Sequence, residues 1–509
     1  MKRNRLGCFM LLILILLLAG GCVRAGDGNH HSENRKTETS GSPSAALSIL
    51  ANLHTSTVPP DRLERLLEEK TGTKLDIQWV PDGSYEEKVN AALATESLPQ
   101  AVFLKNSASL VMFRSAIRDG QFWEIGTLLD QFPNLKRLNR EVLRNTAVDG
   151  KYYGLYQERP LSRQGIIYRQ DWAERLGLKP PSTIDELYTM IERFAHDDPD
   201  GNGKADTIGL TDRNDLIYGA FKTISSYFGT PNEWGVKEGR LQPEFMFPGY
   251  IETMKFFRKL HQEQLMNVDF PVIGKADQQQ LFIEGKAGVY IGALGDVVSL
   301  DAKLKERQPD ARLDVENRVK GPKGYGIWST PGYGSVVLFP KSAIQTEDGL
   351  KEVLAFFDQL MEPEIANMIY WGIENEHYTV EGGKVIPSDD YARLSEEVRP
   401  YLALQIGGHS TIPGLLDVGY SWPTRVKAEQ LVKDNDEQLI HDPTESLESV
   451  TYNNKGVLLQ TIISDATYNF IIGEIDEAGF ESAAAEWKEQ GGGKVIEEFN
   501  EAYRKLQNQ

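Results

Sequence analysis

Cysteine is almost absent from this sequence of 509 residues. The only two cysteines, Cys8 and Cys22, lie close to the N-terminus. The long stretch that follows Cys22 therefore contains no thiol, which excludes disulfide bonds, thiol catalysis and cysteine-ligated metals there.

A membrane-spanning run is missing at the N-terminus as well. The apolar run there covers only Leu6 to Ala19, whereas a spanning helix needs about 20 residues. The basic MKRNR before this run and the two glycines and Cys22 after it follow the order of a secretory signal. Because the small-residue site ends in cysteine, it looks like a bacterial lipoprotein signal.

We therefore predict a signal peptide over residues 1–21 and the attachment of fatty acids, palmitate among them, to Cys22. Residues 22–45 are predicted to form a polar, flexible tether. Two or more acyl chains give a stable anchor, so the protein would be held on the extracellular face of the cell membrane. The alternative is an ordinary secreted protein from which Cys22 has been removed.

Positive charge is scarce. The chain has 55 lysines and arginines against 74 aspartates and glutamates, a formal net charge of −19, and no basic cluster follows the N-terminal signal. This balance argues against nucleic acid as a partner and against electrostatic binding to an anionic surface.

Common catalytic and nucleotide-binding motifs are absent too. There is no GxSxG elbow, HExxH helix, Walker loop or GxGxxG fingerprint. A glycosidase needs two carboxylates about 5 to 10 Å apart across a cleft, and Glu374 and Glu376, beside His377, are the best candidates for such a pair. A polar turn at a surface or cleft rim is the simpler interpretation, and we predict that the chain is not an enzyme.

The most specific motif is DPDGNGKAD, which has the oxygen spacing of a calcium hand. Positions 1, 3, 5 and 9 of such a loop carry oxygen ligands, position 6 is a glycine that makes the sharp bend, and position 7 offers its backbone carbonyl. The matching residues here are Asp198, Asp200, Asn202, Asp206, Gly203 and Lys204. We predict a structural Ca²⁺ ion bound by this loop; a solvated acidic turn is the alternative.

The loop departs from a calcium hand at position 12. A hand supplies a bidentate glutamate there, but this chain has Gly209. Water, Thr207 or a distant carboxylate would therefore have to complete the shell. Because the loop follows a helical segment away from the predicted crossovers between lobes, we expect calcium to stabilise a surface loop and to affect ligand binding little.

From residue 46 onward, apolar runs alternate with amphipathic segments. The predicted strands ALSILANL, KLDIQWV and QAVFL alternate with the predicted helices DRLERLLEEKTG and SYEEKVNAALATES. This order predicts an α/β fold with a largely parallel sheet. Further along, FIEGKAGVYIG predicts a glycine turn into a buried strand, GYGIWSTPGYG over residues 324–334 predicts a crossover, and the C-terminal part is predicted to be largely helical.

The chain is too long for a single core, so we predict two lobes. Lobe 1 is assigned residues 46–150 and 325–395, and lobe 2 is assigned residues 151–324 and 396–509. Hinge strands would join the two lobes.

Several segments carry a family resemblance across nearly the whole chain. They are the Cys22 signal, SLPQAVF from Ser97, YRQDWAERLGLKPPSTIDEL from Tyr168, DDPDGNGKADTIGL from Asp197, LFIEGKAGVY from Leu281, YWGIENEHY from Tyr370 and WKEQGGGKVIEEFNEAYRK from Trp487. Together they resemble family 1 of the bacterial extracellular solute-binding proteins, the receptors of carbohydrate ABC importers. The likeness is greatest to the large lipoprotein branch of LplA type known from Paenibacillus and, more distantly, to alginate-binding proteins.

The resemblance implies a two-lobed periplasmic-binding-protein-like fold that closes on a sugar between the lobes. It implies an ABC permease as the partner, a monomeric receptor, and an oligosaccharide or uronate-type sugar as the ligand. In the alginate-binding relatives a loop of this pattern holds calcium. A surface glycan lyase or hydrolase and a peptide or metal-chelate receptor are the alternatives.

Sugar recognition needs aromatic faces surrounded by carboxylates, amides and arginine. Residues of these kinds near the predicted crossovers form our candidate ligand set, and loops of this kind tend to carry binding groups. The set consists of Trp328, Tyr333, Trp371, Glu374, His377 and Trp422, with Arg169 as a polar clamp. Trp172 and Trp487 fall on predicted helices and are expected in the core.

Overall fold

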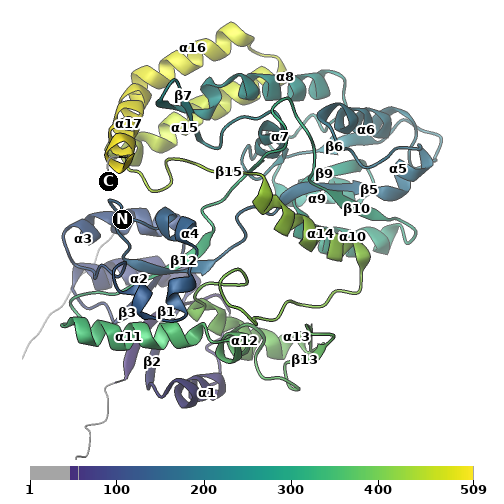
Figure 1. Cartoon of the computed structure of the whole chain (residues 1–509). Helices are drawn as coiled ribbons and strands as arrows, with labels where there is room; N and C mark the ends of the chain where they lie inside the picture. Colours follow the sequence, from purple (N-terminus) through teal and green to yellow (C-terminus); the bar gives the residue numbers. More distant parts are fainter. Residues whose placement is uncertain (1–45, 56, 508–509) are drawn as a thin grey trace, which may run out of the picture. The chain divides into compact units, whose positions relative to one another are not determined.

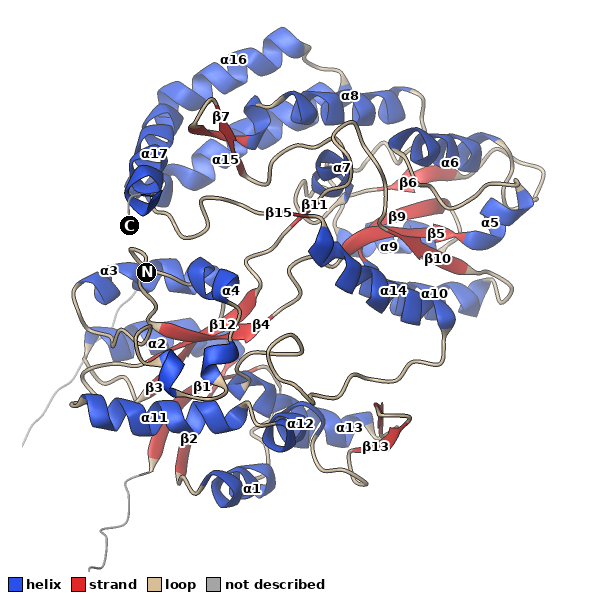
Figure 2. Cartoon of the chain, viewed as in Figure 1, coloured by secondary structure: helices blue, strands red, loops and turns tan. Residues whose placement is uncertain are grey.

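The alternating segments form strands and helices in a computed structural model, which describes residues 46–55 and 57–507. The predicted signal peptide, the tether and Cys22 lie outside these described residues. Within them, no helix has both the length and the apolar character that crossing a membrane requires. Figures 1 and 2 show strands that gather into two main sheets, each with its own helices.

The first sheet has five strands in the order β2-β1-β3-β12-β4. Its strands are β1 (Leu47–Leu53), β2 (Leu75–Pro81), β3 (Ala101–Leu104), β4 (Gly154–Glu158) and β12 (Tyr333–Leu338). β1 is parallel to β2 and β3, whereas β12 is antiparallel to both β3 and β4. All three strands and both helices predicted between residues 46 and 104 are confirmed; the sheet is mixed because β12 enters it in the reverse direction.

Six α-helices contribute buried residues to the core of this sheet. They are α1 (Arg62–Thr71), α2 (Asp82–Ala94), α3 (Ser107–Arg118), α4 (Arg140–Asn145), α11 (Glu347–Leu360) and α12 (Pro363–Trp371). A hairpin of β13 (Tyr378–Glu381) and β14 (Lys384–Pro387) and the short helix α13 (Tyr391–Arg393) follow α12.

The second sheet has four strands in the order β10-β5-β9-β6. They are β5 (Gln164–Arg169), β6 (Ile208–Thr211), β9 (Ala287–Ala293) and β10 (Leu313–Glu316). β5 is antiparallel to β9 and β10, and β6 is parallel to β9. Side chains of β5 alternate between two cores, because Ile166 and Tyr168 join one and Ile167 the other. Both faces of the sheet are therefore covered, which accounts for the uninterrupted burial of β5.

Helices pack on both faces of the second sheet. One core includes residues of α5 (Gln170–Arg175), α6 (Ile184–His196), α7 (Ala220–Tyr227), α8 (Pro248–Gln262), α15 (Val450–Ile472), α16 (Glu477–Trp487) and α17 (Gly493–Gln507). The other includes residues of α9 (Lys275–Ile283), α10 (Val297–Arg307) and α14 (Pro423–Asp434). Two small pairs, β7 (Trp234–Lys237) with β8 (Arg240–Pro243) and β11 (Ile327–Trp328) with β15 (Leu439–Ile440), complete the strands. The helical C-terminal part and the buried positions of Trp172 and Trp487 are confirmed.

The strand pairing differs from the predicted lobe boundaries. β4 belongs to the first sheet although residues 151–158 were assigned to lobe 2, and residues between Val398 and Ile412 also join the first core. β11, assigned to lobe 1, pairs with β15, and Trp328 lies in the core of the second sheet. Sequence periodicity marks where a strand occurs but not which sheet it joins. The chain crosses between the sheets within residues 159–163, 329–332 and 416–421, so a crossover does lie within the predicted stretch 324–334.

Gly209, the residue at position 12 of the calcium-hand pattern, has a packing role. A Cβ at this position would overlap the carbonyl oxygen of Ile191 and lie 2.5 Å from the Cγ2 of the same residue. Because Ile191 is on α6 and Gly209 is on β6, the helix and the strand approach too closely for a side chain between them. A glutamate at position 12 is therefore excluded by the contact between helix and sheet.

We predict that Gly209→Ala lowers the free energy of unfolding by about 1 to 3 kcal/mol or more, because the added methyl group forces α6 away from the sheet. Gly83→Ala is the matched control, since a Cβ there meets nothing within 4 Å, and it should change stability little. Urea denaturation of the three proteins measures the difference. Equal midpoints for the two variants would contradict this packing argument.

Candidate functional site

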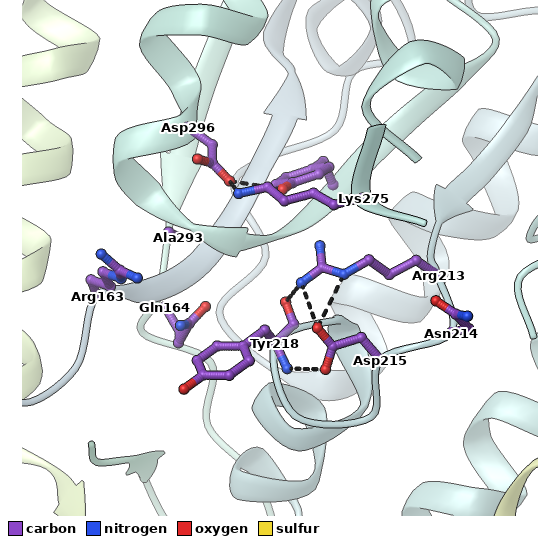
Figure 3. Close-up of a pocket in the computed structure, with 10 residues that line it drawn as sticks. Arg163, Gln164, Arg213, Asn214, Asp215, Tyr218, Lys275, Ala293 and Asp296 are labelled. Atoms are coloured by element: carbon purple, nitrogen blue, oxygen red, sulfur yellow. Dashed lines mark hydrogen bonds and ion pairs between the residues drawn. The ribbon is translucent and has the colours of Figure 1, made fainter. Parts of the chain in front are cut away.

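A cavity of about 400 Å³ lies at one edge of the second sheet (Figure 3). β6 and β9 end at this edge and β5 begins there, since Gln164 is paired with Ala293 and Thr211 with Tyr290. In open α/β sheets, ligands bind beyond the carboxyl ends of parallel strands. The cavity is lined by Arg163, Gln164, Arg213, Asn214, Asp215, Tyr218, Lys275, Tyr290, Ala293 and Asp296.

Arg213 is held rigidly in the wall of this cavity. Its Nη1 donates to Oε1 of Gln278 at 2.7 Å, and its Nη2 donates to Oδ2 of Asp215 at 3.1 Å and to the carbonyl oxygen of Tyr218. Asp215 in turn accepts from the backbone N–H of Tyr218 at 2.8 Å. A buried charge with this many partners is stable, and the network fixes the loop that carries Tyr218.

Tyr218 offers an aromatic surface beside the cavity. Its side chain is 48% exposed, which is unusual for a large aromatic residue held in an ordered loop. Its ring packs edge-on against Trp328, with the ring centroids 5.6 Å apart. Such a ring is suited to cover the C–H face of a sugar.

A second charged group lines the opposite part of the wall. Lys275 Nζ lies 2.8 Å from Oδ2 of Asp296, and the hydroxyl of Tyr290 donates to the same oxygen at 2.8 Å. Burial and the neighbouring Asp296 raise the pKa of Tyr290 above its ordinary value, so its hydroxyl remains a neutral donor.

Two polar side chains of the cavity lack partners. Gln164 is 2% exposed, and its Oε1 accepts no hydrogen bond from the residues that the structure describes. Leaving such an acceptor unpaired costs about 1 to 3 kcal/mol. The side chain of Arg163 is exposed and, among the same residues, makes no hydrogen bond or ion pair. The cavity thus offers a free cation, and its wall contains a buried, unpaired acceptor.

The local charge is positive although the chain is acidic. Three cations, Arg163, Arg213 and Lys275, outnumber the two carboxylates Asp215 and Asp296 in the lining, whereas the whole chain has a formal charge of −19. A ligand that carries carboxylates and hydroxyls fits this balance better than a neutral one.

The first sheet also presents polar residues at the carboxyl ends of its strands. β1, β2, β3 and β4 all run the same way, because β12 is antiparallel to both β3 and β4. The residues that directly follow them are His54, Asp82, Lys105 and Arg159. Asp82 accepts from Asn52 at 2.8 Å and pairs with Lys105 at 2.7 Å, and these two contacts lower its pKa. Residues 159–163 link the two sheet edges and can span at most about 18 Å.

Of the predicted ligand set, Trp328 is in contact with a residue of the cavity, because its ring packs against Tyr218. Trp328 is itself 4% exposed, and its Nε1 donates to Thr223 at 3.2 Å. Tyr333 is buried in the first core at the start of β12. Trp371 is half-buried at the end of α12, with its Nε1 bonded to the carbonyl oxygen of Leu416 at 3.0 Å. Trp422 is half-buried at the start of α14 and packs against a core of the second sheet.

Arg169 lies at the opposite end of β5 from Gln164 and the cavity. It is 3% exposed, pairs with Asp171 at 2.6 Å and covers the ring of Trp172 at 4.5 Å. These contacts give Arg169 a structural role at the end of β5, and its role as a polar clamp stays a prediction.

The residues of GIENEHY form a turn after α12. His377 is buried, accepts from the N–H of Ile373 at 2.9 Å and lies 3.0 Å from Glu397, while Glu374 is exposed. Hydrogen bonds from Arg62 and Arg393 lower the pKa of Glu376 to about 2. The general acid of a glycosidase needs a raised pKa, so Glu376 does not fit that role.

The loop from Asp198 to Asp206 gathers the predicted calcium ligands around one amide. Oδ1 and Oδ2 of Asp198 accept from the N–H groups of Asn202 and Gly203 at 3.0 and 2.9 Å. Nδ2 of Asn202 donates to Asp200 at 2.8 Å and to Asp206 at 3.1 Å. Gly201 and Gly203 have φ of 72° and 80°, which side-chain-bearing residues rarely adopt.

The oxygen donors of this loop are of the kind that a hard cation prefers, since three carboxylates and one amide lie between Asp198 and Asp206. Desolvation raises the pKa of Asp200, and the nearby charges of Asp198 and Asp206 act in the same direction. A cation would relieve this repulsion. Within residues 46–55 and 57–507, however, no three His, Cys, Asp or Glu side chains are arranged closely enough to hold a metal ion. In the loop, the side-chain amide of Asn202 bridges Asp200 and Asp206.

Arg159, Arg163, Gln164 and Tyr218 are not among the residues predicted from the sequence. A signal for the first three is present in ERPLSRQG, where two arginines flank a proline between two apolar strands. Charged residues at the end of a buried strand are candidates for binding. Tyr218 has no comparable signal, because its exposure depends on contacts of Arg213 and Asp215 that the sequence does not reveal.

Three comparisons with known proteins bear on this geometry. A family profile described as bacterial extracellular solute-binding protein matches residues 57–364. The polygalacturonan/rhamnogalacturonan-binding protein YtcQ of Bacillus subtilis is 40% identical over 500 residues, which cover 97% of this chain and 98% of YtcQ. Lipoprotein LipO of the same organism is 31% identical, again over 97% of this chain and 98% of the relative.

A solved structure supports the fold. It is a solute-binding protein associated with an HMO-binding ABC transporter of Bifidobacterium longum infantis, which aligns with a TM-score of 0.70 over 91% of this chain and 99% of its own. The sequence identity is 17%, so this likeness concerns the fold alone: two α/β lobes.

Proposed function

The chain belongs to the bacterial extracellular solute-binding proteins, and we propose on that premise that it captures a uronate-containing oligosaccharide for an ABC importer. Membership of this family supports carbohydrate binding and a role as the substrate-binding protein of an ABC transporter. The acidic ligand is our own inference. The observation that carries it is the cavity at the edge of the second sheet, where Arg163 has no partner among the described residues.

The acidic ligand follows from two independent considerations. The cavity has an excess of positive charge in a strongly acidic protein, and arginine binds a carboxylate through two parallel hydrogen bonds. The name of YtcQ refers to polygalacturonan, a polymer of a uronic acid. Tyr218 would cover a sugar face, and Gln164 would accept a hydrogen bond from a sugar hydroxyl.

Capture requires no chemical step. A ligand that binds the closed arrangement of the two lobes more tightly than the open one shifts the population towards the closed form. The permease would then bind that form. An enzyme is less well supported, because the family relatives are named as binding proteins and Glu376 has a lowered pKa.

We predict that Arg163→Gln weakens binding of trigalacturonate by about 10- to 100-fold, because a charge-assisted pair in the cavity is lost. Isothermal titration calorimetry measures the change. The wild-type protein should bind neutral galactotriose much more weakly than trigalacturonate. Arg240→Gln, which removes an exposed arginine on β8 that does not line the cavity, is the matched control and should bind like the wild type.

Equal affinity of the wild-type protein for the acidic and the neutral trisaccharide would contradict the uronate proposal. An Arg163→Gln protein that binds trigalacturonate as tightly as the wild type would contradict the assignment of this cavity. Turnover of either sugar would support the enzyme alternative.

We further propose that the loop from Asp198 to Asp206 binds structural calcium. Asp198, Asp200, Asn202 and Asp206 would supply side-chain oxygens and Lys204 its backbone carbonyl. The ion would neutralise the carboxylates and fix the loop between α6 and β6.

Calcium removal should lower the melting temperature by several degrees, because a metal that binds only the folded state stabilises it by mass action. Differential scanning fluorimetry with and without EGTA measures the shift. Asp200→Ala should melt at the lower temperature in both conditions, whereas Asp310→Ala, an exposed aspartate outside the loop, should respond like the wild type. A wild-type protein that melts at the same temperature with and without the chelator would contradict the role.

Lipid anchoring at Cys22 is a further part of the proposal, supported by the N-terminal sequence and by the name of LipO. We predict that Cys22→Ser moves the protein from the membrane fraction to the culture medium or leaves it uncleaved, since no acyl chains are attached. Immunoblots of the two fractions and incorporation of labelled palmitate measure this. Retention of the label by Cys22→Ser would refute lipidation at that residue.

A further inference from the structure

Arg159 is the second arginine of the segment that links the two sheets. It directly follows β4, and its backbone N–H donates to the carbonyl oxygen of Gly332 at 2.9 Å. A Cβ on Gly334 would lie 2.7 Å from Nε of Arg159 and 2.8 Å from Oε1 of Gln157. The absence of a side chain at position 334 therefore makes room for the arginine on the edge of the first sheet.

Arg159 has no acceptor for its charge within residues 46–55 and 57–507. Its side chain is exposed, so a ligand can reach it, and it makes no hydrogen bond or ion pair there. Desolvation by the surrounding groups lowers its pKa, and the positive charge of Arg163 acts in the same direction, while Tyr370 opposes both. A cation in this setting is stabilised by an anion that comes from outside the chain.

A buried side chain holds the backbone on both sides of Arg163. Asn435 is fully buried, and its Nδ2 donates to the carbonyl oxygens of Ser162 and Gln164 at 3.3 and 3.2 Å. Its Oδ1 accepts from Asn317 at 2.6 Å. Pro160 restricts the same segment further. The two arginines are thus held at two defined places along the link, one on the first-sheet edge and one in the cavity of the second.

We propose that Arg159 binds a second carboxylate of the ligand, distinct from the one that Arg163 binds, so that the protein selects oligouronides with at least two acidic residues. This inference rests on the proposed function. It adds a ligand subsite on the edge of the first sheet and a minimum number of carboxylates.

The test is a double-variant cycle by calorimetry with trigalacturonate and its fully methyl-esterified form. Arg159→Gln, Arg163→Gln and the double variant are compared with the wild type. Arg159→Gln should weaken binding of the acid by about 10- to 100-fold and change binding of the ester by less than about 3-fold. The loss in the double variant should equal the product of the two single losses, because arginines on different carboxylates act independently.

Arg159→Lys keeps the charge but not the two parallel hydrogen bonds, so it should lose less affinity for the acid than Arg159→Gln does. Arg159→Met, which keeps the apolar stem, replaces Arg159→Gln in the cycle if that variant does not fold. Three outcomes overturn the inference while the proposed function stands. Arg159→Gln could lose no affinity for the acid, or it could lose as much affinity for the ester as for the acid. The double variant could also bind the acid no more weakly than the weaker-binding single variant, which would mean that both arginines share one carboxylate. Equal wild-type affinity for acid and ester would instead remove the proposed uronate ligand itself.

Discussion

Asn435 is the residue on which the geometry of the proposed site depends. Its amide donates to Ser162 and Gln164 on the segment that links the two sheets and accepts from Asn317, whose Nδ2 also donates to Leu431 on α14. Asparagine in a dry interior is stable only when its donors and acceptors are satisfied. Here its partners are two backbone carbonyl oxygens of the link and the side chain of Asn317. The same hydrogen bonds that satisfy Asn435 therefore hold the backbone around Arg163 and Gln164 in place, whereas the backbone N–H of Arg159 is bonded to Gly332.

Charge distribution explains how an acidic protein can bind an acidic sugar. The net charge of −19 is spread over a large surface and is screened beyond about 8 to 10 Å in physiological salt. A ligand in the cavity interacts mainly with Arg163, Arg213 and Lys275, and two of these are already paired with Asp215 and Asp296. The paired cations shape the cavity, whereas the unpaired Arg163 is free for the ligand.

The sequence was sufficient for the elements and the family but not for the cavity. Apolar runs such as AVFL and AGVYIG become β3 and β9 because strands buried on both faces need continuous apolar residues. The sheet that a strand joins depends on distant partners, which is why β4 and β11 were placed in the other lobe. Aromatic residues near glycines were selected as ligand candidates, yet Tyr333 and Trp328 fill cores, because large rings gain most from burial. Gln164 and Arg163, which have unsatisfied polar groups, lie in the segment ERPLSRQG. The charges of this segment are visible in the sequence, but the cavity that these two residues line is formed by distant strands and loops.

The central claim is that a carboxylate of the ligand lies against Arg163 at the edge of the second sheet. A crystal structure of the protein with trigalacturonate tests it directly. The account predicts a carboxylate within hydrogen-bonding distance of the Arg163 guanidinium, with Tyr218 against a sugar ring and Gln164 Oε1 bonded to a hydroxyl. A sugar bound elsewhere, or one whose carboxylates all face solvent, would contradict it.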